Sequence, residues 1–398
     1  MGVVSGRVDP GVALPAIGYV MWGGHPEDYL SQVADHGRYC KFGEVLPPEG
    51  VTGSPLAWFE ANHPDWIEYR SDRVTPAWYS DQGGRYVDTH DVPVDIANPA
   101  VQAYIASTCA TAAVQTGYDG VGFDHGTTLN LYGRVGHRDD SGQWVQQYSG
   151  AIADQTYRLA VISAFASIAR QARAIGAQHG VTRFVIALND VPDLDVRPDW
   201  WTDLLPSVDV VFDEHGFTRD GGGTGWVTDV PTSSNVVANP WLTIVNDYSE
   251  AESMGKSIVI NALEPYQIDD SDPPHPADVD WVLANYLLVR DARTMQGFLI
   301  TGVSAPGQPF LYDQVNEVVP AYSAAVGSPT DGMRQLPGGG YTRSYSSGSV
   351  FVNPSAATSV TVIVPAGSWR DLSGRSVAGG TAELLAPHSG LVLTATSA

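Results

Sequence analysis

Positive charge is scarce in this chain of 398 residues, which has 21 lysine and arginine residues against 44 aspartate and glutamate residues. The formal net charge is −23. Such a surface repels phosphate backbones and anionic lipid headgroups, so we expect neither nucleic acid nor a membrane as a partner. A neutral or cationic substrate fits this charge better, although adaptation for solubility or habitat would produce the same composition.

Cysteine is almost absent, since Cys40 and Cys109 are the only two in the chain. We expect two small core residues, one on a strand and one on a helix, with a single disulfide left open. No run of about 18 apolar residues is present that could span a membrane. No signal peptide is visible at the N-terminus either, which leaves the compartment open between secretion after loss of a leader and the cytoplasm.

Several catalytic motifs are also missing. The chain has no Gly-x-Ser-x-Gly elbow, which weakens the case for a serine hydrolase. It has no Cys-x-x-Cys, His-x-His or His-Glu-x-x-His pattern, so we expect no catalytic zinc, no other metal and no cofactor. No glycine-rich phosphate loop follows the first predicted strand, where Gly23-Gly24 is only a weak signal, and this argues against a doubly wound nucleotide-binding sheet.

What the chain does contain is an alternation of short apolar runs and longer helical patterns up to about residue 325. The runs are continuous and rich in Val, Ile and Phe, as is typical of strands that are covered on both faces. Eight such strands alternating with helices predict a (β/α)₈ TIM barrel. The predicted strands are residues 16–22, 38–46, 86–94, 120–124, 183–189, 209–213, 257–262 and 297–301.

Helical patterns are clearest at residues 99–115, 152–179 and 276–293, where apolar side chains recur near helical spacing. The stretch 47–82 is long and aromatic, and we interpret it as an elaborated loop of the kind that forms the wall of a barrel active site.

The pattern changes near the C-terminus. Residues 328–340 are rich in Gly, Pro and Ser and are predicted to be a linker. Residues 341–398 contain short β-branched runs separated by turns, which predicts a small antiparallel β-sandwich. The predicted organisation is therefore a catalytic barrel over residues 1–327, the linker, and the C-terminal sandwich.

Polar side chains gather at the C-terminal ends of the predicted strands, which is where the active site of a barrel lies. Because the rest of each strand is apolar, this pattern indicates a site and not a solvated face. Aromatic residues nearby offer flat apolar surfaces for sugar rings. The candidate site residues are Tyr19, Trp22, Lys41, Glu44, Asp124, His125, Asn189, Asp190, Asp213, Glu214, Asn261 and Glu264, with Asp95 directly after the third predicted strand.

Two of these strands end in acids, at Asp124 and at Asp213-Glu214. Cleavage of a glycosidic bond needs one carboxylic acid to protonate the leaving oxygen and one carboxylate to attack the anomeric carbon or to activate water. Asp124 is the candidate nucleophile or base. Glu214 is the candidate acid because phenylalanines near it could raise its pKa, and Asp213 is its competitor. A strand-terminal Asp can equally be a helix cap or a turn residue.

These residues also carry a family resemblance. The chain is similar to several (β/α)₈ glycoside hydrolase families, namely the clan D α-galactosidase-like enzymes, the endo-α-1,4-polygalactosaminidase group and a set of sequence-defined families. In these, the aspartate of the fourth strand is typically catalytic, which implies Asp124. The sixth-strand run ending in Glu implies Glu214 as its partner. The resemblance is carried by Asn98-Pro99-Ala100-Val101-Gln102, by Tyr118-Asp119-Gly120-Val121-Gly122-Phe123-Asp124, by residues 210–217, and by residues 348–354, 369–374 and 385–390 of the sandwich.

The family strand often ends in two acids, whereas His125 follows Asp124 here. This leaves open whether Asp124 acts as nucleophile or orients the sugar. The sequence therefore predicts a glycoside hydrolase acting on a poly- or oligosaccharide. The alternatives are a carbohydrate-binding or structural barrel without catalysis, and a barrel lyase or isomerase that uses one carboxylate and Lys41.

Overall fold

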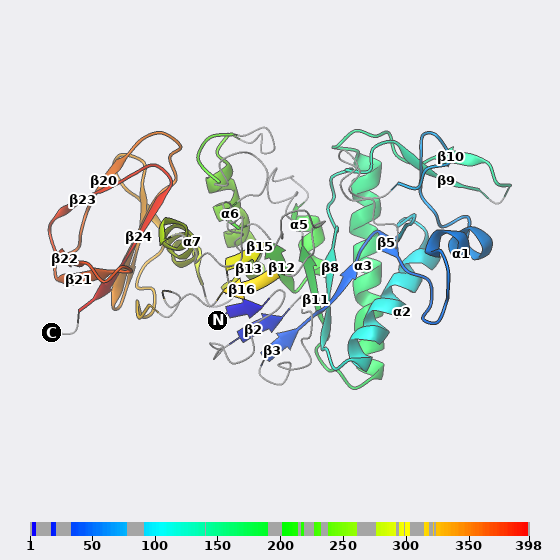
Figure 1. The fold of residues 1–398 in the computed structure, drawn as a ribbon, viewed down its shortest axis with the longest axis horizontal. Helices are drawn as coiled ribbons and strands as arrows, with labels where there is room; N and C mark the ends of the chain where they lie inside the picture. Colours follow the sequence, from blue (N-terminus) through cyan, green and yellow to red (C-terminus); the bar gives the residue numbers. More distant parts are fainter. Residues whose placement is uncertain are drawn as a thin grey trace. The chain divides into compact units, whose positions relative to one another are not determined.

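A computed structural model describes residues 2–4, 17–20, 33–77, 91–139, 141–189, 201–213, 216–218, 227–231, 238–260, 276–291, 294–297, 299–302, 314–317, 321 and 324–396 (Figure 1). The chain forms two compact units. Residues 35–193 and 198–211 make one of them, which we call the site unit. Residues 1–34, 194–197 and 212–398 make the other, which we call the terminal unit.

The site unit is built around three parallel strands, β4 (Arg38–Lys41), β8 (Gly120–Asp124) and β11 (Val185–Asn189). β8 pairs with both of the others, with Cys40 opposite Phe123 and Ala187 opposite Gly122. The β8 bounds are those predicted, and those of β11 are two residues shorter at the start. β12 (Val210–Asp213) begins beside β11, because the Asp209 amide donates to the Ile186 carbonyl at 2.8 Å.

Two long helices of this unit start where the sequence supplies caps. α2 (Pro99–Gln115) has the predicted bounds, with the Asn98 side chain accepting from the Ala100 amide and Pro99 in the first turn. α3 (Gln155–Gln178) begins after Asp154, whose carboxylate accepts from the amides of Thr156 and Tyr157. Both helices bury one apolar stripe, and they pack against each other.

The two faces of β8 differ. Val121 and Phe123 point to the same face, where Phe123 is fully buried against Phe42 and against Phe165 of α3. Gly120, Gly122 and Asp124 therefore share the opposite face. A Cβ atom at Gly120 would lie 2.3 Å from the Val185 carbonyl oxygen, so only glycine permits this close approach between the strands.

The chain between β4 and β8 adds smaller elements to the site unit: α1 (Pro55–Asn62), β5 (Glu44–Val45), β6 (Tyr69–Arg70) and β7 (Val92–Pro93). β7 pairs with β5 in an antiparallel manner. The prediction of a third parallel strand at 86–94 is therefore wrong for its described part, because residues 92–93 turn back onto β5. Residues 78–90 lie outside the described residues.

The chain between β8 and α3 adds a hairpin, β9 (Val135–Arg138) and β10 (Trp144–Gln146), which pairs with β6 in a three-stranded sheet. The pattern reasoning did not predict this hairpin. The short helix α5 (Trp201–Leu204) and a 3₁₀ turn at Leu205–Ser207 precede β12.

The terminal unit contains four parallel strands in the order β2 (Ile17–Val20), β1 (Gly2–Val4), β14 (Thr294–Gly297) and β13 (Ser257–Ile260). The first strand of the chain is thus β1 and not the predicted 16–22 run, which supplies the second strand, β2. β1 was missed because three residues are too few to show a strand pattern. α6 (Pro240–Ser253) and α7 (Pro276–Val289) belong to this unit.

Residues 334–395 form antiparallel β-structure, as the sequence predicted. Its apolar core includes Phe351, Val362 and Leu393. This structure packs against α7, where the Tyr345 hydroxyl donates to the Leu287 carbonyl at 2.5 Å and Arg343 donates to the carbonyls of Leu288 and Arg290. One sheet has the order β17 (Arg334–Gln335), β18 (Tyr341–Tyr345), β19 (Gly348–Asn353), β24 (Ser389–Ala395), β21 (Ser368–Asp371) and β22 (Ser376–Ala378), and the second pairs β20 (Val360–Ile363) with β23 (Ala382–Leu385).

The remaining pair, β15 (Leu299–Gly302) and β16 (Gln314–Glu317), is antiparallel. The predicted strand at 297–301 therefore falls across two elements, since β14 ends at Gly297 and β15 begins at Leu299. β3 (Val33–His36) precedes β4 directly in the chain.

Candidate active site

Three neighbouring strands of the site unit end in polar residues that lie side by side. Lys41 of β4 is the register partner of Asp124 of β8. Asn189 follows Leu188, which is the partner of Phe123, so it comes level with Asp124 on the other side. The three residues share the face of the sheet that carries Gly122, because alternate residues of a strand point the same way. The sequence predicted all three as strand-end site residues, and the fold brings them together.

The Asp124 carboxylate accepts three hydrogen bonds and lies close to one imidazole nitrogen. Its Oδ1 atom accepts from Asn189 Nδ2 at 3.0 Å and from the His125 amide at 2.9 Å. Its Oδ2 atom has longer contacts, 3.3 Å from the Tyr39 hydroxyl and 3.4 Å from His125 Nε2. The side chain is 16% exposed, so one carboxylate oxygen is firmly fixed while the group still reaches the surface of the site unit.

His125 adopts a left-handed backbone conformation with φ of 61°. Few residues other than glycine occupy this region, and such strain concentrates at functional sites. Here the turn brings both the amide and the imidazole of His125 back onto the carboxylate of its own neighbour, Asp124. The predicted site residue His125 is therefore in direct contact with the candidate catalytic group.

Tyr39 is a member of this site that the sequence reasoning missed. Its hydroxyl donates to Asp124. Partial burial of the phenol, in a residue that is 39% exposed, followed by the negative charge of Asp124, raises the pKa of Tyr39 above its ordinary value, so the hydroxyl stays protonated and donates to the carboxylate. The signal was available, because Tyr39 lies two residues before Lys41 on the same strand and therefore on the same face.

Lys41 lies between two further acids. Its Nζ atom is 2.5 Å from Asp91 Oδ2 and 3.2 Å from Glu44 Oε2. Glu44 was predicted as a site residue. Its side chain is only 3% exposed, and its carboxylate pairs with the ammonium group of Lys41. Asp91 was missed because the sequence reasoning took only the end of the predicted 86–94 strand. We call Lys41, Glu44 and Asp91 the lysine cluster.

A second group of polar side chains lies deeper in the same unit. Asp95 is 5% exposed and accepts from Gln147 Nε2 at 2.6 Å, and its Oδ2 atom is 3.5 Å from His137 Nδ1. Glu68 is 3% exposed, and burial followed by the charge of Asp95 raises the pKa of Glu68 well above its ordinary value. Its Oε1 atom has no hydrogen-bond partner among the described residues.

Asp213, the competitor of Glu214 for the role of acid, ends β12 in the terminal unit. Its Oδ2 atom accepts from the Tyr248 hydroxyl of α6 at 2.5 Å, and its Oδ1 atom accepts from the Gly216 amide at 2.8 Å. The residue is 2% exposed. Asp213 therefore makes buried structural contacts with α6 and the following turn, and this placement argues against a direct contact with substrate.

Several predicted site residues cannot be placed alongside these. Tyr19 lies on β2, of which the backbone alone is described. The other predicted members lie outside the described residues: Trp22, Asp190, Glu214, Asn261 and Glu264. Within the parts of the chain that are described, no group of three or more His, Cys, Asp or Glu side chains is arranged to hold a metal ion. None of the described helices combines the length and the apolar character needed to cross a membrane.

A scan against protein-family models finds no match, and neither does a search of curated protein sequences. Solved structures similar to this chain include a GH27 β-L-arabinopyranosidase from Geobacillus stearothermophilus, at 12% identity and a TM-score of 0.46, covering 100% of this chain and 85% of that one. Another is the type III pullulan hydrolase from Thermococcus kodakarensis, at 11% identity and a TM-score of 0.49, covering 95% of this chain and 68% of that one. A family GH13_31 enzyme matches at 9% identity and a TM-score of 0.46, and the match covers 96% of this chain and 92% of that enzyme.

These neighbours are glycoside hydrolases by name. At such identities and TM-scores the likeness carries no argument about residues or reaction, so the functional argument rests on the site itself.

Proposed function

We propose that the protein is a glycoside hydrolase that cleaves O-glycosidic bonds of a poly- or oligosaccharide, with Asp124 as nucleophile or base and Glu214 as general acid. The observation that supports this most directly is the Asp124 carboxylate itself. It lies at the C-terminal end of a parallel strand, is partly exposed, and is oriented by Asn189, His125 and Tyr39. A carboxylate fixed in this way can meet a developing positive charge on a sugar ring.

The unequal contacts of the two Asp124 oxygens suit this role. Oδ1 has two short hydrogen bonds, which set the orientation of the group. Among the described residues, Oδ2 has contacts of 3.3 and 3.4 Å, which can lengthen as the oxygen approaches an anomeric carbon or a water molecule. We therefore assign the reacting position to Oδ2. In the lysine cluster beside it, Lys41 and Asp91 have side chains that are each 14% exposed, and they offer an ammonium donor and a carboxylate acceptor for the hydroxyl groups of a neutral sugar.

The choice of Glu214 over Asp213 as general acid rests on the surroundings of Asp213. The carboxylate of Asp213 is already engaged by Tyr248 and by the Gly216 amide, and it is buried. A proton donor has to reach the glycosidic oxygen within hydrogen-bond distance. Of the two acids that end the sixth predicted strand, Glu214 is therefore our candidate.

We also propose that the parallel strands close into a (β/α)₈ barrel. In chain order the eight are β1, β2, β4, β8, β11, β12, β13 and β14, with β3, which is separated from β4 by one residue, counted together with β4. Helices separate the later ones, with α2 before β8, α3 before β11, α5 before β12, α6 before β13 and α7 before β14. The proposed domains are the barrel over residues 1–327, a linker that begins at residue 328, and the sandwich over residues 341–398; β17, which lies inside the predicted linker 328–340, pairs with β18 and so belongs to the sandwich.

The test is hydrolysis by matched isosteric variants on a panel of aryl glycosides and polysaccharides. Asp124→Asn and Glu214→Gln each should lower kcat by about 10³-fold or more, because each removes a group that acts in the transition state. The control is Glu60→Gln, an exposed position of α1 away from these contacts, which should retain full activity. Azide should restore turnover to Asp124→Ala, in which the removed side chain leaves room for the anion, if Asp124 is the nucleophile.

Full activity in a folded Asp124→Asn variant would refute the assignment of Asp124. Retention of sugar by the wild-type protein in affinity electrophoresis, without turnover of any substrate on the panel, would instead favour a carbohydrate-binding barrel. An unsaturated or isomerised product in mass spectra would favour a lyase or an isomerase.

A further inference from the structure

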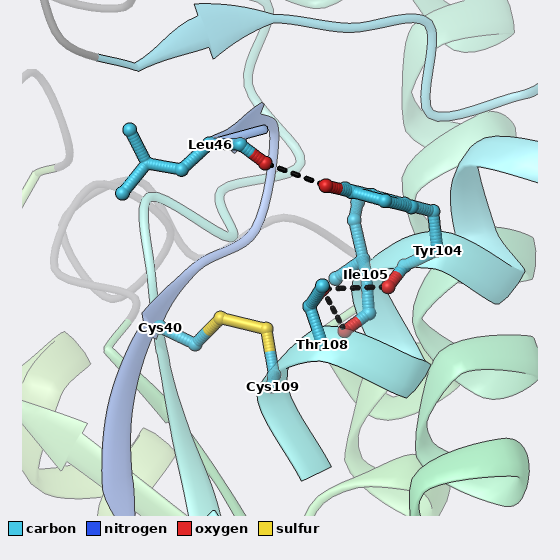
Figure 2. The surroundings of a disulfide bond; sticks show 6 residues. All are labelled: Cys40, Leu46, Tyr104, Ile105, Thr108 and Cys109. Atoms are coloured by element: carbon cyan, nitrogen blue, oxygen red, sulfur yellow. Dashed lines mark hydrogen bonds between the residues drawn. A yellow bond between two sulfur atoms is a disulfide. The ribbon is translucent and has the colours of Figure 1, made fainter. Parts of the chain in front are cut away.

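Cys40 lies between the two β4 residues that face the candidate site, Tyr39 and Lys41. Because side chains alternate along a strand, Cys40 points away from the site, towards the helices that cover the other face. There it forms a disulfide with Cys109 of α2, with Cα atoms 6.0 Å apart (Figure 2). The interpretation of the two cysteines as separate small core residues is therefore wrong, and the disulfide that was left open is present.

α2 contacts the site-bearing segment a second time. The Tyr104 hydroxyl donates to the Leu46 carbonyl at 2.7 Å, and Tyr104 lies a little more than one helical turn before Cys109 (Figure 2). The helix is thus attached to the chain at Cys40 and again at Leu46. Lys41 and Glu44, whose side chains pair at 3.2 Å, lie between these two attachments.

The backbone pairing of β4 within the site unit is short. The strand is four residues long, and within the described site unit it pairs only with β8. The Phe42 amide extends this pairing by donating to the Asp124 carbonyl at 2.9 Å. A short strand contributes few hydrogen bonds of its own, and local opening of such an element needs less free energy than global unfolding. The covalent link from its middle residue to a 17-residue helix therefore restrains the strand much more strongly than its hydrogen bonds alone.

We propose that the Cys40–Cys109 disulfide is a positioning element of the candidate site. It fixes the position and the orientation of the C-terminal end of β4. The Tyr39 hydroxyl then contacts Asp124 Oδ2, and Lys41 contacts Glu44 and Asp91. The cysteines do not touch substrate and act only through Tyr39 and Lys41. The kinetic consequence of this inference rests on the proposed hydrolase function, whereas the restraint on β4 does not.

The expected effect on catalysis follows from the distances involved. The Tyr39 hydroxyl is already 3.3 Å from Asp124 Oδ2, near the limit of a hydrogen bond. A displacement of roughly 1 Å at a catalytic group can lower a rate by about a hundredfold. Loss of the disulfide should therefore lower kcat more than it changes KM, even at temperatures where the protein is fully folded.

The experiment compares two variants of the full chain. Cys40→Ala/Cys109→Ala removes the disulfide without burying a hydroxyl group. Ile168→Ala is the matched control, since Ile168 is fully buried in α3 and its truncation also destabilises the site unit while leaving the disulfide in place. Hydrogen–deuterium exchange is measured by mass spectrometry for residues 38–46 and 185–189, and kcat and KM are measured well below the melting temperature of each protein.

We expect amides of residues 38–46 to exchange about tenfold faster in the disulfide variant than in the Ile168→Ala control, while residues 185–189 exchange alike in both. Equal exchange of residues 38–46 in the two variants would overturn the proposal, whatever the activity. Normal kcat in a folded disulfide variant would overturn the kinetic consequence. If the wild-type protein hydrolyses nothing, the proposed function fails and the exchange comparison still decides the role of the disulfide.

A second measurement covers the case in which the double variant does not fold. The wild-type protein is treated under native conditions with dithiothreitol, which reduces the disulfide to two thiols and is itself oxidised to its cyclic disulfide. Mass spectrometry after alkylation confirms the two thiols. Faster exchange confined to residues 38–46 supports the proposal, and unchanged exchange in the fully reduced protein contradicts it.

Discussion

Glu68 makes the stability of the site unit depend on pH in a direction that can be stated in advance. The side chain is 3% exposed, and its Oε1 atom has no partner among the described residues. Burial and the charge of Asp95 raise the pKa of Glu68 well above 4.5. The folded protein therefore holds a proton that the unfolded chain releases once the pH exceeds about 4.5.

The sign of the effect follows from proton counting. Between the two pKa values the folded state binds more protons than the unfolded state, so the free energy of unfolding falls as the pH rises. For one group the slope is at most about 1.4 kcal/mol per pH unit. Raising the pH from 5 should then lower the stability contributed by Glu68, and the loss continues until the pH passes the raised pKa of the folded state.

The change to make is Glu68→Gln, which is nearly isosteric and does not titrate. The measurement is urea unfolding of both proteins between pH 5 and pH 8, followed by tryptophan fluorescence. The variant should gain stability relative to wild type as the pH rises. Other titrating groups are common to the two proteins and cancel in the difference. The control Glu60→Gln removes an exposed carboxylate and should keep the pH dependence of wild type.

The refuting result is a difference between wild type and Glu68→Gln that stays constant from pH 5 to pH 7. It would mean that Glu68 has nearly the same pKa in the folded and unfolded states, and that water or another donor reaches its carboxylate.

Three further predictions concern other contacts. Cys40→Ala/Cys109→Ala should lower the free energy of unfolding by about 4 kcal/mol, because the disulfide closes a loop with a sequence separation of 69 residues; an unchanged urea midpoint would contradict this. Tyr39→Phe should lower kcat/KM by about tenfold or more with little loss of stability, since a donor to the Asp124 carboxylate is lost. Tyr248→Phe should cost roughly 1–3 kcal/mol, because buried Asp213 loses a donor, and hydrolysis should persist; loss of activity in the folded variant would assign Asp213 to the reaction.

The parts of the fold that the sequence predicted best are those with a strong local pattern. β8 has the predicted bounds because a short apolar run stops at a charged residue. α2 has its predicted bounds because Asn98 and Pro99 form a cap that can be read directly. Such signals come from neighbouring residues, so one sequence contains all the information needed to find them.

Pairing between distant segments could not be read in this way. The 92–93 segment resembles a barrel strand locally. In the structure it pairs instead with Glu44 and Val45 of β5, nearly fifty residues earlier in the chain. The disulfide depends on the register that places Cys40 beside α2, which neither cysteine encodes alone. β1 consists of three residues, and it is recognisable only through its parallel partners β2 and β14.

In the candidate site too, residues with a local signal were predicted, and residues whose contacts depend on distant segments or on the shared face of a strand were missed. Asp124 and Asn189 were predicted because each ends an apolar strand, and Lys41 was predicted with Glu44 from the 38–46 strand, since parallel strand ends meet at one edge. Tyr39 was missed because it precedes the strand end by two residues, although it shares the face of Lys41. Asp91 was missed because its contact with Lys41 depends on the antiparallel return of the chain at β7.

The contacts of Tyr345 and Arg343 with α7 have a consequence for how this protein can be divided. The last carbonyl groups of a helix have no partner within that helix. In α7 the carbonyls of Leu287 and Leu288, in its last turn, and the carbonyl of Arg290, directly after its end, accept hydrogen bonds from the C-terminal sheets instead. A chain cut at residue 327 would leave these acceptors and an apolar helix surface without cover. The C-terminal β-structure is thus the cap of a helix in the preceding fold, and it cannot be removed or exchanged as an independent module.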